Sequence, residues 1–166
     1  MDELFPLVDE LGKVIGSALR SECHNGSKLL HPVIHLHIVN NRGELLLQKR
    51  SANKDIQPGK WDTSVGGHID YGESIEAALF REVGEELGIT SFIPQFLRSF
   101  IFESEIEKEM VYTYKTIYEG SFSFDKNEID EIRFWSIEKI KEYLNKNVFT
   151  PNFESEFDFL IENDLL

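Results

Sequence analysis

The segment from Gly67 to Ile89 constrains the fold more than any other part of the chain. Ser74 is a favoured N-cap residue and Gly88 a favoured helix terminator, so the spacing predicts a helix over 74–87. Apolar residues recur every four positions in this helix, and they predict one buried face made of Ile75, Leu79, Val83 and Leu87.

The same helix would carry three glutamates, Glu82, Glu85 and Glu86, on a second face. Helical geometry brings them within roughly 100° of one another. Like charges at these spacings destabilise a helix by roughly 0.2–0.5 kcal/mol a pair. A hard divalent cation such as Mg²⁺ or Mn²⁺ reverses that penalty, because it selects carboxylate oxygens. A solvated acidic face is the alternative interpretation of three glutamates alone.

Composition limits the classes of function. The 166 residues include 17 Lys and Arg against 30 Asp and Glu, a net charge of −13. This length predicts one domain over 1–166, and the charge excludes a mainly electrostatic binder of nucleic acid and argues against binding to anionic lipid. The single cysteine, Cys23, excludes an intrachain disulfide and a four-cysteine zinc site. Without an 18-residue apolar run or a basic, apolar N-terminal segment, we expect a cytoplasmic protein and no membrane span.

Turn signals divide the chain into short elements that predict an α/β (α+β) layered domain. Asn40 to Gly43 would form the turn of a hairpin. The predicted elements are a small N-terminal hairpin at about 5–16, strands over 32–39, 44–50, 61–65, 92–102 and 110–118, a strand ending at Phe134 and Trp135, and helices over 74–87, 136–144 and 154–165.

The pattern over 67–89 is identified as a Nudix box, in which glycine, five residues, glutamate and seven residues precede Arg-Glu-apolar-x-Glu-Glu-x-Gly-apolar. This resemblance to the Nudix hydrolase superfamily implies the Nudix fold, a mixed β-sheet sandwiched between helices. It also implies hydrolysis of a diphosphate linked to another moiety. Carried over by position, the metal ligands for Mg²⁺ or Mn²⁺ would be Glu82, Glu85, Glu86 and the carbonyl of Gly66, while Gly67, Glu73 and Arg81 would support the loop and helix geometry.

The flanks, from about Val14 to Tyr143, resemble the branch of this superfamily that contains isopentenyl-diphosphate isomerase. The matching residues are Cys23-His24, His31, Gln48-Lys49-Arg50, Lys54, Pro58-Gly59-x-Trp61, Ser64 and Gly67-His68. The resemblance implies a second divalent metal site made of His24, His31, His68, Glu107 and Glu109. Mixed imidazole and carboxylate ligation suits Mn²⁺, Zn²⁺ or Fe²⁺. Two other histidines, His35 and His37, alternate within a predicted strand, and we interpret them as core residues outside the site.

Two departures from the isomerase pattern bear on the reaction. Gly66 stands where the isomerase has its catalytic cysteine, and Asn152 matches the position of a tryptophan that steadies the isomerase's carbocation. An isomerase moves protons on and off an alkene and needs an acid there. The chain also keeps the whole glutamate box, which the isomerase degrades. The sequence therefore favours a diphosphate hydrolase, with an isopentenyl-diphosphate-type isomerase and a non-catalytic Nudix-fold ligand-binding module as alternatives.

Several roles stay open at the level of sequence. The general base could be Glu82, Glu128 or Glu131. Arg50 and Lys54 match diphosphate-binding positions of the isomerase, with solvated loop cations as the alternative. We expect a small-molecule substrate, either nucleoside-diphosphate-linked or a similar small diphosphate compound. The oligomeric state is open, a homodimer included. Aromatic residues that could line a substrate pocket or belong to the core are Phe100, Phe102, Tyr112 and Tyr114.

Overall fold

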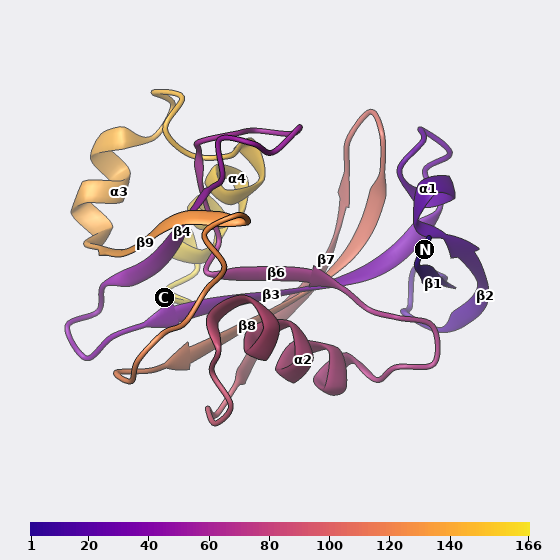
Figure 1. Cartoon of the computed structure of the whole chain (residues 1–166), viewed down its shortest axis with the longest axis horizontal. Coiled ribbons are helices and arrows are strands. Elements are labelled where there is room, and N and C mark those ends of the chain that lie inside the picture. The colour runs from indigo at the N-terminus through magenta and orange to yellow at the C-terminus, as the bar shows by residue number, and fades with distance from the viewer.

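The chain forms a mixed sheet with helices on both faces and a separate two-stranded hairpin (Figure 1). The computed structural model describes residues 1–166. In chain order the elements are β1 (Leu4–Val8), β2 (Val14–Leu19), α1 (Arg20–Cys23), β3 (Leu30–Val39), β4 (Leu45–Arg50), β5 (Trp61–Asp62), β6 (Val65–His68), α2 (Ile75–Leu87), β7 (Gln95–Glu103), β8 (Lys108–Ile117), β9 (Ile129–Trp135), α3 (Ile137–Tyr143) and α4 (Pro151–Glu162).

Strand β3 is the centre of the sheet. It pairs in parallel with β8 along its whole length and antiparallel with β6, and β7 then extends the sheet beyond β8. A second group of strands forms around β4, which pairs antiparallel with both β5 and β9. The two groups meet at a single register pair, Val39 opposite Leu45. Strands β3 and β4 therefore diverge after this point, and the space between them becomes important for the site.

Alternation along the strands builds one core on each face of the sheet. On β4, Leu46 belongs to the core under α2, whereas Leu45 and Leu47 point to the opposite face, toward α3 and α4. Figure 1 shows α2 on one side of the sheet and α3 and α4 on the other. This arrangement confirms the predicted mixed sheet between helices.

Helix α2 has the predicted ends and the predicted buried face. Ser74 accepts a hydrogen bond from the amide of Ala77 at 3.1 Å, and Gly88 ends the helix in the left-handed conformation with φ of 67°. Leu79, Val83 and Leu87 are buried, each contributing roughly 1.5–3 kcal/mol to folding. The buried stripe fixes the rotation of the helix about its axis, so its glutamates are directed toward the strands at the cleft.

The N-terminal residues form the predicted hairpin, β1 and β2, which is followed by a short helix, α1, that the sequence did not predict. Phe5, Ala18 and Cys23 form a small core of their own at this end of the molecule. None of the helices is both long enough and apolar enough to cross a membrane.

Three predicted elements differ from the structure. The turn at Asn40 forms, but β3 and β4 are not a full hairpin, because β3 pairs with β8 and β6 instead. The predicted strand over 61–65 is split into β5 and β6, which belong to the two different groups of strands. The last helix begins earlier than predicted, at Pro151, because Thr150 caps it.

Candidate active site

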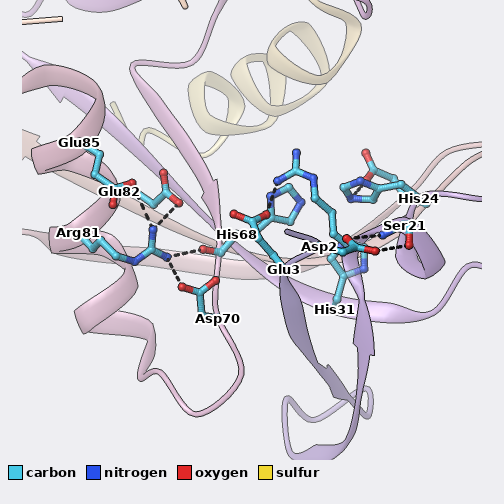
Figure 2. A network of polar contacts seen from close by, with 12 residues as sticks. Asp2, Glu3, Ser21, His24, His31, His68, Asp70, Arg81, Glu82 and Glu85 are labelled. Carbon is cyan, nitrogen blue, oxygen red and sulfur yellow. Dashed lines mark hydrogen bonds and ion pairs between the residues drawn. The ribbon is translucent and has the colours of Figure 1, made fainter. Parts of the chain in front are cut away.

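A cleft of about 980 Å³ opens where β3 and β6 diverge from β4. Ser64 links the two groups of strands at its base, since its hydroxyl donates to the carbonyl of Leu46 and accepts from the amide of Ile38. The cleft is bordered by the carboxylate face of α2 at one end and by a group of histidines at the other, as Figure 2 shows. Of the predicted site residues, those lining it are Arg50, Lys54, Gly66, Gly67, His24, His68, Glu82, Glu85, Glu86, Glu107, Glu109 and Glu128.

Arg81 organises the carboxylate end. Its Nε and Nη2 atoms donate to the two oxygens of Glu73 at 2.8 and 2.9 Å, and Nη2 also donates to the carbonyl of His68 at 3.1 Å. Nη1 donates to Glu82 at 2.9 Å and to Glu85 at 3.4 Å. Arg81 therefore ties the loop before α2 to the helix and orients two of the three glutamates (Figure 2).

Gly67 lies against the side chain of Glu82. A Cβ atom at position 67 would be only 2.5 Å from Glu82 Cγ and Oε2. A residue with a side chain there would push the carboxylate out of its place, so the close approach of β6 to α2 explains the need for glycine.

The buried end of the acidic face holds a carboxylate with an unused oxygen. Glu86 accepts a hydrogen bond from Gln48 at 3.1 Å through Oε1, while its buried Oε2 has no partner. Burial raises the pKa of Glu86 to about 8 and also raises the pKa of Glu82. A divalent cation would supply the missing partner and favour the ionised carboxylates, so the residues present fit a metal such as Mg²⁺ or Mn²⁺.

Four elements bring the predicted second site together. His24 follows α1, His31 lies on β3, His68 ends β6, and Glu107 immediately precedes β8. One ligand atom from each of these four residues lies within 4.8 Å of the others. Glu109 is near this group, with its Oε2 3.8 Å from His68 Nε2 and 4.0 Å from His31 Nε2.

The three imidazoles each have a buried ring nitrogen without a hydrogen-bond partner. In each ring this nitrogen is Nε2, and Glu107 Oε2, 3.0 Å from His24 Nε2, is not aligned for a hydrogen bond. His31 Nδ1 contacts the carbonyl of Leu29 at 2.9 Å, which puts the proton on Nδ1 and leaves a lone pair on Nε2. Burial lowers the pKa of all three histidines and favours the neutral ring.

Packing holds the three histidines in place from the N-terminal side. The ring of Phe5 stacks on that of His68 with centroids 4.6 Å apart. An ion pair between Arg20 and Glu3, 2.7 Å long, and a hydrogen bond from Ser21 to Asp2 fasten the N-terminus to α1 beside the cluster. The unpartnered nitrogen atoms and the adjacent carboxylates fit a divalent metal here as well.

The loop cations and the candidate bases are only partly together. Lys54 forms an ion pair with Glu128, and both line the cleft. Arg50 also lines it and lies 3.7 Å from Asp62. Glu131 does not line the cleft: it pairs with Arg133 at 2.7 Å, because β9 turns it away from the open side. Of the two candidate bases Glu128 and Glu131, which the sequence left open, only Glu128 therefore lines the cleft.

The predicted aromatic residues divide between two places. Phe102 lines the cleft, and Phe100 lines a small adjoining pocket. Tyr112 and Tyr114 instead pack against the core under α2. Asn152 lines both cavities, and Gly66 leaves the cleft without a side chain at the position that matches the isomerase's cysteine.

Sequence reasoning missed a group of polar residues beside the cleft, one of which, His35, lines it. Glu156 of α4 is buried beside β3, where it contacts His35 at 2.7 Å and His37 at 3.1 Å and accepts from Thr113 at 2.6 Å. His35 also lines the cleft, so only His37 is the fully buried core residue that we expected for both. A signal was present, because Glu156 occupies a core position of an amphipathic helix beside Phe157.

Comparisons with known proteins agree with this geometry. The NUDIX domain model matches residues 29–154. The chain is 31% identical to a protein named isopentenyl-diphosphate Delta-isomerase 2 from Photorhabdus laumondii, over 99% of the chain and 96% of that protein. It is 30% identical to an uncharacterized Nudix hydrolase of Yersinia pestis, over 90% of the chain and 81% of that protein. A crystal structure from Deinococcus radiodurans has a TM-score of 0.81 at 24% identity, covering 95% of this chain and 98% of the other, which supports the fold.

The chain therefore belongs to the Nudix family, and within it to a branch whose members carry the names of isopentenyl-diphosphate isomerases and of Nudix hydrolases. The resemblance inferred from the box and its flanks is confirmed.

Proposed function

We propose that the protein is a metal-dependent hydrolase that cleaves the diphosphate bond of a small compound, with Glu82, Glu85, Glu86 and the Gly66 carbonyl as ligands of Mg²⁺ or Mn²⁺. The observation that carries the proposal is that the three carboxylates line the same end of the cleft, with a buried oxygen of Glu86 lacking a hydrogen-bond partner. Arg81 balances part of the negative charge of Glu82 and Glu85, and a divalent cation would balance the rest.

Each group has a defined task in this reaction. When bound, the metal would neutralise charge on the bridging oxygens and lower the pKa of a water molecule. Arg50 and Lys54 lie in the cleft and would bind the diphosphate oxygens. Glu82 and Glu128 are the candidates for the base that accepts the proton from water, since both line the cleft. We leave Glu131 out of the proposed site because its carboxylate pairs with Arg133 elsewhere.

We further propose a second divalent cation at His24, His31, His68, Glu107 and Glu109. Its donor set of imidazoles and carboxylates suits Mn²⁺, Zn²⁺ or Fe²⁺. Because His24, His68, Glu107 and Glu109 line the same cleft, this site would lie at the end opposite the carboxylates of α2. A polar substrate could therefore contact both ends.

The residues that line the cleft indicate the class of substrate. Most of these residues are polar or charged, which suits a compound whose recognition depends on its diphosphate. Phe102 and Ile106 offer a limited apolar surface for the attached moiety. We propose a nucleoside-diphosphate-linked or similar small diphosphate compound, acted on in the cytoplasm.

The isomerase is the second candidate, because a relative with that name matches nearly the whole chain. Against it, position 66 offers no acid to donate a proton to an alkene. Cys23 is no substitute, since it is buried in the N-terminal core and burial raises the pKa of its thiol to about 11.

The test is to measure phosphate and pyrophosphate release from a panel of diphosphate compounds with Mg²⁺ and, separately, with Mn²⁺. The panel includes nucleotide sugars, nucleoside diphosphates and isopentenyl diphosphate, with products identified by mass spectrometry. We expect metal-dependent cleavage of at least one compound. Conversion of isopentenyl diphosphate to its isomer, without release of phosphate, would instead establish the isomerase. Metal-dependent binding without any conversion would establish the ligand-binding module.

A further inference from the structure

Glu156 is a buried carboxylate outside both proposed metal sites, and it contacts His35, a histidine that lines the cleft. Glu156 is 5% exposed, and its two oxygens are shared among His35, His37 and Thr113. These residues come from α4, β3 and β8. Such a group is costly to bury unless its charge is balanced, so the source of the balancing charge has to be found among its neighbours.

The geometry assigns that charge to His35. His37 is fully buried, and its Nδ1 has no partner, so protonating it would leave a buried N–H without an acceptor. Arg98 forms no ion pair with Glu156, and its guanidinium stacks over the rings of Phe100 and Phe159 at 4.0 and 3.4 Å. His35 alone has a nitrogen, Nε2, on the side of the cleft.

The electrostatics agree with this assignment. Burial opposes a charged His35, but the negative charge of Glu156 and their hydrogen bond outweigh it and raise the pKa of His35. The carboxylate of Asp62 adds negative potential in the same direction. The pKa of Glu156 lies well below its ordinary value in spite of its burial, and the charge of His35 is the largest of the lowering effects.

The absence of a side chain at position 66 opens the imidazole edge to the cleft. His35 and Gly66 are register partners on β3 and β6. A Cβ atom at position 66 would lie 3.4 Å from His35 Cδ2 and 3.7 Å from Nε2. With glycine there, this edge of the ring remains free in the cleft between the carboxylate end and the histidine cluster.

We propose that His35 is a substrate-binding residue that donates a hydrogen bond from Nε2 to an anionic oxygen of the diphosphate, with Glu156 as the positioning residue that holds Nδ1. This inference rests on the proposed function, because it needs a phosphate-bearing ligand in the cleft. A charge-assisted hydrogen bond of this kind changes binding by about ten- to one-hundredfold.

Two matched substitutions test the proposal. His35→Asn keeps a donor near the position of Nδ1 for Glu156 and removes the ring edge that faces the cleft. His37→Gln keeps a donor near the position of Nε2 for the same carboxylate and alters nothing in the cleft. The probe is imidodiphosphate with Mg²⁺, measured by calorimetric titration. We expect at least about tenfold weaker binding for His35→Asn and unchanged binding for His37→Gln.

The same pair separates this inference from the proposed function. In an active enzyme, His35→Asn should raise KM more than it lowers kcat. Wild-type protein that binds imidodiphosphate but hydrolyses nothing contradicts the hydrolase only, and weaker binding by His35→Asn would still support the inference. Equal dissociation constants for the wild type and His35→Asn overturn the inference even if the wild type is a hydrolase.

A measurement on the wild type covers the case in which His35→Asn does not fold. The imidazole nitrogen resonances are followed by NMR while imidodiphosphate and Mg²⁺ are added. The expected result is a shift of His35 Nε2 with no comparable shift of His37. An unchanged His35 resonance at saturation would refute direct contact.

Discussion

At the scale of single residues, the shape of the cleft depends on the missing side chains of two glycines as much as on its charged residues. Gly67 allows Glu82 to lie against β6, and Gly66 leaves the ring of His35 uncovered. Arg81 then restricts the movement of the Glu82 side chain, because it donates hydrogen bonds to Glu73, to Glu82 and to the carbonyl of His68. The positions of the carboxylates of Glu82 and Glu85 are therefore set by a few close contacts.

Gly67→Ala should impair activity more than stability. The added Cβ would lie within 2.5 Å of Glu82 Cγ and Oε2, so the carboxylate has to move. A misplacement of about 1 Å costs up to ~100-fold in rate, and we expect a loss of at least about tenfold. Gly16→Ala is the control, because nothing lies within 4 Å of its Cβ position. Equal turnover by the two variants would refute the role of this contact.

Glu73→Gln should weaken the link between the loop and α2. Hydrogen bonding from Arg81 lowers the pKa of Glu73, so its contribution to stability is present above the ordinary carboxyl pKa and is lost as the pH falls through the lowered value. We expect the variant to be less stable by about 1 kcal/mol at about pH 7. Urea unfolding at about pH 7 and about pH 3 checks this, and an equal difference at both values would argue against the charged pair.

At the scale of elements, α2 owes its position to its ends and its buried stripe. The box spacing and the caps made this helix predictable, because these signals are local in the sequence. The pairing of His35 with Glu156 was not predictable, since 121 residues separate them and the contact depends on how α4 packs against β3. The same holds for Glu128 and Glu131, because Glu128 lies in the turn before β9 and Glu131 lies within β9, opposite Lys49 of β4.

Ser74→Ala tests the start of α2. Removing the hydroxyl leaves the amide of Ala77 without its acceptor. The expected cost is about 1 kcal/mol in the free energy of unfolding, measured by urea denaturation. Ser74→Thr retains an oxygen acceptor and should cost less. If the alanine and threonine variants were equally stable, the cap would not contribute as described.

At the scale of the whole molecule, the histidine cluster joins parts of the chain that are distant in sequence. Residues from 24 to 107 meet there, and the N-terminal hairpin packs over them through Phe5. The family resemblance indicated which residues would meet, but residue spacing alone could not, because the cluster needs the parallel register of β3 and β8. Strand β6 thus connects the two ends of the cleft, because His68 belongs to the histidine cluster and the adjacent Gly67 lies against Glu82.

A metal at this cluster should stabilise the fold. A ligand that binds only the folded state at about 100 times its dissociation constant adds about 2.7 kcal/mol, which raises Tm by roughly 5–10 °C for a chain of this size. We expect this rise with Zn²⁺, and its reversal by a chelator. His68→Gln should lose most of it, whereas Glu85→Gln, at the other end of the cleft, should keep it. A shift that His68→Gln fully retains would place the metal elsewhere.

The most direct test of the account is the hydrolysis rate of Glu85→Gln beside that of Glu76→Gln. Both residues are exposed on α2, but only Glu85 lines the cleft. Because the Glu85 side chain is 62% exposed, its substitution should leave folding intact. The account predicts that Mg²⁺-dependent turnover falls at least about a hundredfold in Glu85→Gln and is unchanged in Glu76→Gln. Undiminished turnover in a folded Glu85→Gln protein would contradict the assignment of α2 as the metal-binding helix.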